Sequence, residues 1–325
     1  MDLKRGHTRI WHLFFAVGIM TLMWSCKPEY PEPTDRREQL NHINICVLGN
    51  SYSNDAYSYL PFILLDYGIT CNIHIYYRGS GSLHDLDEQW DDRGDYGIAD
   101  LDGKNHIRLH FWIDTRKQRQ WKKEKGRSAH DVLEMENWDI VSLQQGGSRA
   151  KDIDSYYPYL QNVIDKIHQT CDYSFDLGWF MAYNRGWDNM NEESISTQHE
   201  IVDESPFDIV FPVATAVFSC QEVLPFSELG DSPYKKMYAS DNVHLQEGLP
   251  CYLASLTLAQ AIFDKYGTGI SVLGDKVRPT QEWIKGVNGI TPNGTSTGVT
   301  DENCRHAQRA AVSAIIHPFL IIPVE

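Results

Sequence analysis

The apolar, largely β-branched run from Ile43 to Leu48 constrains this chain most, because of the way it ends. Gly49 and Asn50 stop the run, and Ser51 follows at once. Short apolar runs of this kind are typical of strands buried on both faces of a parallel sheet. The carboxyl edge of such a sheet is where α/β proteins place their ligands. We therefore predict a buried strand that delivers the Ser51 hydroxyl to this edge.

The rest of the chain alternates between strand-like and helix-like segments. We expect strands at 43–48, 70–77, 138–143, 173–181 and 208–211, and helices at 54–67, 153–168, 249–265 and 302–317, with Ser53 or Asn54 capping the first helix. This alternation is typical of an α/β fold, here a three-layer α/β/α sandwich with a mostly parallel five-stranded sheet. Residues 95–114 interrupt it with two alternating runs around Asp102-Gly103, which predicts a β-hairpin insertion between strands two and three.

The N-terminus has the pattern of an export signal. Lys4, Arg5 and Arg9 precede an apolar run, Ile10–Ser25, and Cys26 follows directly. The run is shorter than the stretch of about 20 residues that spans a bilayer. The cysteine after a small residue resembles a bacterial lipoprotein signal. We predict a signal peptide at 1–25, lipidation at Cys26, a polar tether at 26–41 and one folded domain at 42–325; plain secretion and an uncleaved anchor are the alternatives.

The composition excludes some classes of partner. The formal net charge is −15, so little on this chain could neutralise nucleic-acid phosphates or an anionic membrane surface. We expect no nucleic-acid partner, and no membrane contact except through the lipid anchor. The remaining cysteines lie far apart, several of them in apolar runs, and are expected to be small buried residues: Cys46, Cys71, Cys171, Cys220, Cys251 and Cys304. Since none has zinc-site spacing, we predict no metal. We also expect no cofactor: the glycine-rich segment 79–84 lacks the third glycine of a dinucleotide-binding motif and follows the second strand rather than the first.

Asp241 and His244 complete a set of residues that could hydrolyse an ester. A serine hydroxyl needs a neighbouring base to become a nucleophile. Ser51, Asp241 and His244 occur in the chain order of one class of hydrolytic triad. In a helical turn, residues three apart share a face, which would let Asp241 orient the imidazole. Alternatively, the serine segment only caps a helix and Asp241 and His244 are an ordinary surface pair. Ser53 is a second hydroxyl nearby, better placed to cap the helix than to attack.

Five segments resemble the ordered sequence blocks of the SGNH (GDSL) hydrolase superfamily. In chain order they are GNSYS at 49–53, YYRGSGSLHD at 76–85, DIVSLQQGGS at 139–148, IVFPVATAVF at 209–218 and SDNVHLQEG at 240–248. The resemblance extends from Ile43 to about Lys265. It is strongest to an uncharacterised secreted bacterial branch, related through its QQG motif to carbohydrate O-acetylesterases. It implies the SGNH/flavodoxin-like form of the predicted sandwich.

The resemblance also implies catalytic roles. Ser51 would attack an ester carbonyl, His244 would accept the serine proton and return it to the leaving alcohol, and Asp241 would hold the histidine. Water would then hydrolyse the acyl-enzyme.

The developing oxyanion would be bound by three donors. These are the N–H of Ser51, a backbone N–H at Gly79 or Gly81, and the side-chain amide of Gln145. Two features depart from the family pattern. Asn50 stands where the family usually has aspartate, and the segment 144–147 reads Gln-Gln-Gly-Gly where Gly-x-Asn-Asp is usual.

The function that these observations predict is that of an exported serine esterase. It would act on small acyl esters, acetyl esters above all, of a carbohydrate in the cell envelope, in the periplasm or at the outer membrane or cell surface. We expect an acylated carbohydrate as substrate and no obligate protein partner. The alternatives are an SGNH lipase or thioesterase and a catalytically silent glycan-binding surface lipoprotein.

Overall fold

The computed structural model describes residues 40–92, 107–111, 122–124, 126–229, 237–279 and 298–324. All of them belong to one unit of the chain, residues 33–325. The predicted signal peptide, Cys26 and most of the predicted tether lie outside the described residues. Among the residues described, no helix is long and apolar enough to cross a membrane.

One sheet runs through the domain, with the strand order β4-β3-β2-β1-β5-β6-β7. The strands are β1 His42–Gly49, β2 Thr70–Tyr77, β3 Ile107–Phe111, β4 Lys122–Glu124, β5 Ile140–Gln144, β6 Asp176–Phe180 and β7 Ile209–Phe211. The five strands from β2 to β7 in this order are parallel, whereas β3 and β4 are antiparallel. The predicted mostly parallel five-stranded sheet is confirmed, and two strands extend it at one edge.

Strand β3 lies within the predicted insertion, residues 95–114, whereas β4 follows it in sequence. Strand β3 pairs antiparallel with β2 on one side and with β4 on the other. The predicted turn at Asp102-Gly103 and the predicted arm before it lie outside the described residues. Edge strands present unpaired N–H and C=O groups. Because β2 would otherwise be such an edge, β3 satisfies its backbone.

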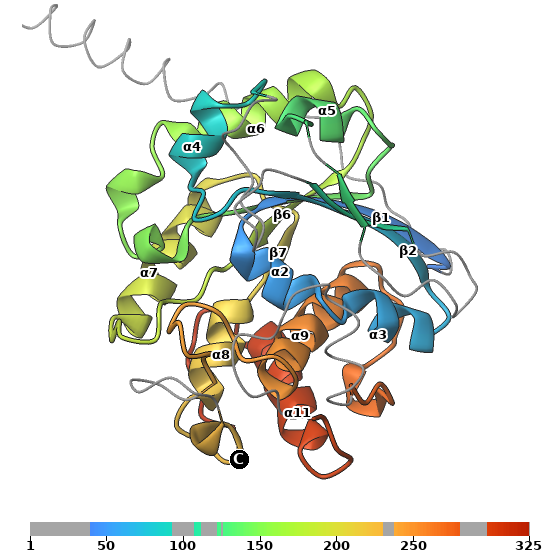
Figure 1. Cartoon of the computed structure of the whole chain (residues 1–325), viewed down its shortest axis with the longest axis vertical. Coiled ribbons are helices and arrows are strands. Elements are labelled where there is room, and N and C mark those ends of the chain that lie inside the picture. The colour runs from blue at the N-terminus through green and yellow to red at the C-terminus, as the bar shows by residue number, and fades with distance from the viewer. Residues whose placement is uncertain are drawn as a thin grey trace, which may run out of the picture. The chain divides into compact units, whose positions relative to one another are not determined.

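Helices cover both faces of the sheet, as Figure 1 shows, with α4, α5 and α6 on one side and α2, α3, α8, α9 and α11 on the other. The helices are α2 Ser51–Tyr57, α3 Leu60–Asp66, α4 Leu83–Glu88, α5 Ala129–Leu133, α6 Tyr159–Thr170, α7 Asn191–Glu204, α8 Val213–Cys220, α9 Leu249–Lys265 and α11 Cys304–Ile316. The three-layer α/β/α architecture is therefore confirmed. Helices α4, α5, α7 and α8 have no counterpart among the predicted elements.

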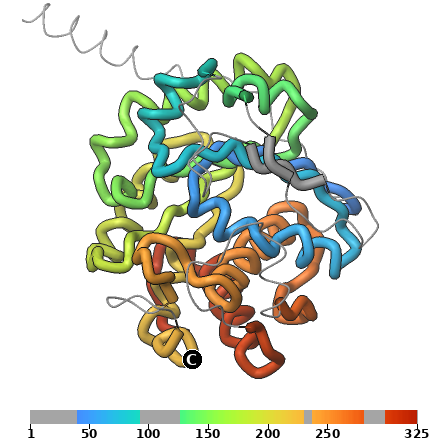
Figure 2. Tube along the Cα trace, in the orientation of Figure 1, coloured from blue at the N-terminus to red at the C-terminus, as the bar shows by residue number. Residues whose placement is uncertain are grey.

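Helix α9 is the centre of one helical layer. Every residue from Leu249 to Phe263 is buried, and the helix contacts α2, α3, α8 and α11. In Figure 2 this orange segment lies beside the blue α2–α3 segment, although the two are almost 200 residues apart in sequence. A helix that is apolar on all sides needs such a complete enclosure.

Two predicted helices begin or end differently because of proline. The predicted helix 54–67 is two helices, α2 and α3, with Pro61 in the first turn of α3. Pro61 has no N–H to donate to the carbonyl of Tyr57, so one continuous helix cannot form. Likewise α6 begins at Tyr159, directly after Pro158, rather than at Ile153.

The six cysteines in the described residues are buried and form no disulfide, which confirms that they serve as small core residues.

The chain connectivity makes the carboxyl end of β1 a switch point. Strand β1 leads to β2 on one side, and the chain later passes β1 to enter β5 on its other side. Helices that leave neighbouring strands in opposite directions open a crevice at this edge, where open α/β sheets bind ligands. Strand β1 ends at this edge with Gly49, two residues before Ser51.

Candidate active site

Ser51 is the first residue of α2, directly after β1. Asn50 caps the helix: its Oδ1 accepts the N–H of Tyr52 at 3.0 Å, while its Nδ2 donates to the carbonyl of Gly81 at 3.0 Å. An aspartate could make the first bond but not the second, because a carboxylate has no hydrogen to donate. This explains the departure from the family pattern, and it makes Asn50 the cap in place of the predicted Ser53 or Asn54.

Asp241 and His244 are in direct contact, as the sequence predicts. His244 Nδ1 donates to Asp241 Oδ2 at 2.6 Å. The segment is a tight turn rather than the expected helical turn: Asn242 has φ of 60°, and Asp241 Oδ1 accepts the N–H groups of Val243 at 2.9 Å and His244 at 3.0 Å. An aspartate that bonds the backbone two residues on stabilises such turns. The imidazole is thus fixed by both its backbone and its ring.

The turn that carries His244 lies against α2. The N–H of Leu245 donates to Asp55 Oδ2 at 3.0 Å, and the His244 ring lies edge-on to Tyr52 with centroids 6.5 Å apart. Asp55 follows Ser51 by four residues, so the two side chains share one face of α2. The His244 turn therefore lies against the helix that begins with Ser51.

Ser51 and His244 are not joined by a hydrogen bond. Within the described part of the chain, neither the Ser51 hydroxyl nor His244 Nε2 has a hydrogen-bond partner. Bonds between a nucleophile and its base are often long without substrate and shorten when substrate binds. The arrangement has one ring nitrogen held by a carboxylate and the other unengaged.

The charges at this turn favour an imidazolium. Burial lowers the pKa of His244, but the carboxylates of Asp55 and Asp241 outweigh it and raise the pKa to about 9. Partial burial raises the pKa of Asp241, but the hydrogen bond and charge of His244 lower it to about 2. Asp241 is therefore ionised at neutral pH.

Asp55 is a site residue that sequence reasoning missed. Burial raises the pKa of its carboxyl to about 6, against the opposing charge of His244 and a hydrogen bond from Tyr183. The only signal in the sequence is an acidic residue one helical turn after Ser51, which is indistinguishable from an exposed helix position until the His244 turn is placed.

The structure does not support the role predicted for Gln145. Its Nε2 donates to the carbonyl of Ser155 at 3.0 Å and to its hydroxyl at 3.1 Å, and its Oε1 accepts the N–H groups of Leu83 at 3.1 Å and Gly146 at 2.8 Å. The side chain is 0% exposed. The polar atoms of a buried amide need hydrogen-bond partners, and both Nε2 hydrogens of Gln145 are bonded to Ser155. It joins two loops and has no hydrogen left for an oxyanion.

The two candidate glycines differ in what their N–H groups do. Gly81 donates its N–H to the carbonyl of Arg78 at 3.1 Å. No hydrogen bond of the Gly79 N–H is found among the described residues. Ser51 stands in the first helical turn, where N–H groups have no partner within the helix. The backbone donors that remain are those of Ser51 and Gly79.

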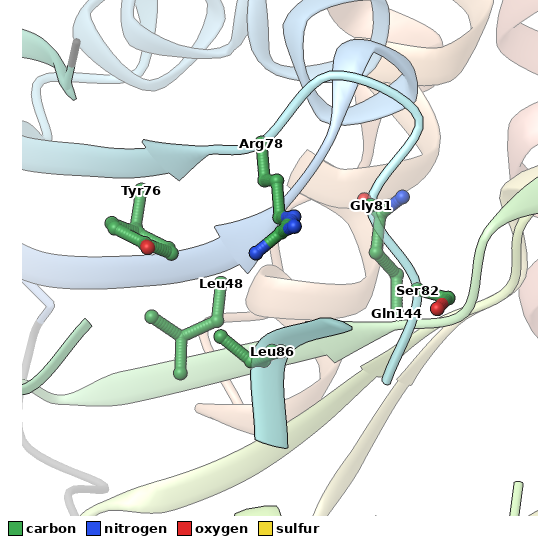
Figure 3. Close-up of a pocket in the computed structure, with 8 residues that line it drawn as sticks. Leu48, Tyr76, Arg78, Gly81, Ser82, Leu86 and Gln144 are labelled. Atoms are coloured by element: carbon green, nitrogen blue, oxygen red, sulfur yellow. The ribbon is translucent and has the colours of Figure 1, made fainter. Parts of the chain in front are cut away.

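Ser53 is not a second nucleophile. Its side chain is fully buried and donates to Gln144 Oε1. The Gln144 amide lies at the small cavity drawn in Figure 3, together with Arg78, Gly81 and Ser82. The cavity has a volume of about 10 Å³, room for about one water molecule. It is too small to hold an ester.

The described residues contain no group of three or more His, Cys, Asp or Glu side chains that could hold a metal ion.

Comparisons with known proteins bear on the fold. No protein-family model and no curated protein matches the chain. A solved DUF4886 family protein from Bacteroides uniformis ATCC 8492 is similar, with 18% identity and a TM-score of 0.66 over 87% of this chain and 98% of that chain. This likeness supports the three-layer α/β/α fold, whose parallel strands β2-β1-β5-β6-β7 have the flavodoxin-like order. A putative SGNH hydrolase from Slackia heliotrinireducens matches at 16% identity and a TM-score of 0.41, over 68% of this chain and 100% of that chain. An acetyl xylan esterase from Geobacillus stearothermophilus matches at 13% identity and a TM-score of 0.41, over 70% and 96%.

Proposed function

We propose that this SGNH-like chain is a serine esterase that hydrolyses small acyl esters of a carbohydrate through an acyl-enzyme. The observation that carries the proposal is the 2.6 Å hydrogen bond from His244 to Asp241, on a turn fastened to the helix that Ser51 begins. An imidazole with one nitrogen bonded to a carboxylate and the other unengaged is suited to act as a general base.

The reaction proceeds in two displacements. The Ser51 hydroxyl attacks the ester carbonyl while His244 Nε2 takes its proton. The bond from the carbonyl carbon to the alcohol oxygen then breaks, and the departing alcohol receives that proton. Water repeats the attack on the acyl-enzyme and releases the acid. Asp241 stabilises the imidazolium in both steps, and the N–H groups of Ser51 and Gly79 bind the oxyanion.

A sugar as the alcohol half of the ester is supported by the loop beside the His244 turn. Trp187 on this loop is 46% exposed, and the guanidinium of Arg185 lies 5.5 Å from the centroid of its ring. The N–H of Gly186 donates to the carbonyl of Asn242 at 2.7 Å, which fastens the loop to the His244 turn. An exposed aromatic ring with a polar edge is a suitable surface for a sugar ring.

We also propose that the chain is exported and anchored by a lipid on Cys26. This rests on the sequence pattern of the first 26 residues, which lie outside the described part of the chain.

Ester hydrolysis by matched variants tests the proposal. We expect the protein to release p-nitrophenol from the acetate ester, to release acetate from an acetylated oligosaccharide, and to prefer both over a long-chain ester. Ser51→Ala and His244→Ala should each lower kcat by about 10³-fold or more, because a serine triad acts as a unit. Ser205→Ala, at the end of α7 and away from α2, is the matched serine control and should retain activity.

Other results would contradict the proposal. A preference for the long-chain ester would indicate a lipase, and no release from any ester would indicate a glycan-binding protein. Undiminished activity of Ser51→Ala or His244→Ala would remove that residue from the mechanism.

A further inference from the structure

Asp55 connects three parts of the candidate site. Its Oδ2 accepts the hydroxyl of Tyr183 at 2.5 Å and the N–H of Leu245 at 3.0 Å. Tyr183 follows β6 and is fully buried, and Leu245 is the neighbour of His244. One carboxylate oxygen thus joins the helix of Ser51, the loop after β6 and the turn that carries His244.

The same carboxylate places a second negative charge near the imidazole. His244 is bonded to Asp241 on its Nδ1 side, while Asp55 reaches the turn from α2. The other groups that act on this region are Glu247, a third acidic group just after the turn, Tyr52 on α2, and Arg185, whose positive charge lowers the pKa of Tyr52. Among the groups that raise the pKa of His244, the charge of Asp55 has the largest effect.

We propose that Asp55 is a positioning residue of the reaction: it fastens the His244 turn to α2 and stabilises the imidazolium that forms when His244 takes the serine proton. This inference rests on the proposed esterase function. We assign Asp55 no part in proton transfer: its Oδ2 only accepts hydrogen bonds, from Tyr183 and Leu245. It acts through charge and through the placement of His244, and does not touch the ester.

The proposal predicts a particular pH dependence. His244 must be neutral to accept the serine proton, so kcat/KM should rise with pH through the pKa of His244. Asp55→Asn removes the charge but leaves an amide oxygen to accept from Tyr183 and Leu245. Without this negative charge the imidazolium is less stable, so the pKa of His244 falls. The rising limb of the pH profile should move to lower pH by about 1–3 units.

Asp139→Asn is the matched control. Asp139 is a buried carboxylate that likewise accepts a backbone N–H, that of Asn44 at 2.8 Å, but it lies at the opposite end of β1. The Asp139→Asn variant should have the rising limb of the pH profile at the same pH as the wild type. A structural role for Asp55 without electrostatic coupling would lower kcat/KM at every pH and leave the limb unmoved, and that result would overturn the proposal.

A direct titration separates this inference from the esterase function. NMR of the full chain with labelled histidine reads the pKa of His244 without any substrate, and His244→Gln identifies the signal. We expect the pKa in the wild type to lie above the ordinary value of 6.5, and to be lower in Asp55→Asn. An equal pKa in both proteins, or a wild-type pKa at or below 6.5, would overturn the proposal even if the esterase is active.

Asp55→Ala provides a second variant in case Asp55→Asn does not fold. It removes the same negative charge without placing an amide beside Tyr183 and Leu245. The pKa of His244 should again fall, and no change would count against the proposal.

Discussion

At the scale of single residues, amide side chains hold the loops of the sheet edge together. Asn50 accepts from Tyr52 and donates to Gly81, and Gln145 bonds both Leu83 and Ser155. Gln198 does the same on the next loop: it accepts the N–H of Ala182 and donates to the carbonyl of the same residue. An amide side chain offers a donor and an acceptor on neighbouring atoms, so it can bond both polar groups of a backbone. The polar residues of these motifs therefore fix the backbone on which Ser51 stands.

Gly147 shows how tightly these loops approach. A Cβ at this position would lie 2.0 Å from the Tyr52 ring and 2.6 Å from the backbone oxygen of Tyr183. We expect Gly147→Ala to lower the free energy of unfolding by about 1–3 kcal/mol, since forced shifts in a packed region cost this much. Gly274→Ala, whose nearest neighbour would be 3.8 Å away, is the control. Denaturant unfolding measures both, and equal stability of the two variants would contradict the crowding.

At the scale of elements, the break between α2 and α3 depends on a contact with α9. The backbone leaves the helix at Ser58 and Tyr59, so its polar groups need other partners. Ser255 on α9 supplies them: its hydroxyl donates to the carbonyl of Ala56 at 2.6 Å and accepts the N–H of Tyr59 at 3.1 Å. A break in a buried helix is stable only when the exposed backbone groups are bonded again. One serine of α9 therefore orients the helix that begins with Ser51.

Ser255→Ala should destabilise the protein by about 2 kcal/mol, because two buried backbone groups lose their partner. Thr257→Val on the same helix is the matched control: its hydroxyl bonds only the carbonyl of Leu253 within α9. We expect that variant to lose less than about 1 kcal/mol. Chemical denaturation followed by circular dichroism distinguishes them, and a smaller loss in Ser255→Ala than in Thr257→Val would refute this account of the break.

At the scale of the whole molecule, buried carboxylates set the pH at which the domain is most stable. Asp275 accepts the hydroxyl of Tyr252 on α9, and its backbone carbonyl accepts from Gln308 on α11. Burial raises the pKa of its carboxyl to about 6, although the bond from Tyr252 opposes this. Because the pKa of Asp275 is higher in the folded protein than in the unfolded chain, its protonation favours folding. This contribution is complete at a pH below the unfolded pKa and is lost as the pH rises through about 6.

Asp275→Asn removes that ionisation. The difference in melting temperature, Asp275→Asn minus wild type, should be about 2–4 °C larger at about pH 8 than at about pH 5. The reason is that only the wild type must ionise a buried group over this range. Asp301→Asn, on an exposed carboxylate that also pairs with Arg278, should show almost no such difference. Thermal scans at both pH values provide the measurement. If the melting temperature of Asp275→Asn relative to the wild type were lower at about pH 8 than at about pH 5, the assignment would be contradicted.

The predictable part of the fold was the part that local patterns specify. Strand β2 and helix α9 have the predicted bounds, because an apolar run between turn residues leaves little choice of length. Helix α7 was not predicted, since its polar sequence has only a weak apolar face. The break between α2 and α3 was also not predicted, because it depends on Pro61 and on Ser255 far along the chain.

The sequence by itself determined the succession of the five parallel strands along the chain, and it identified Ser51, Asp241 and His244 as candidate catalytic residues. These follow from local composition, turn residues and short spacings, which act within a few residues of chain. Only the tertiary structure decided that Gln145 is committed to Ser155 and that Asp55 faces the His244 turn. Hydrogen bonds between segments as much as 190 residues apart make those assignments, and no local pattern encodes which buried polar group meets which.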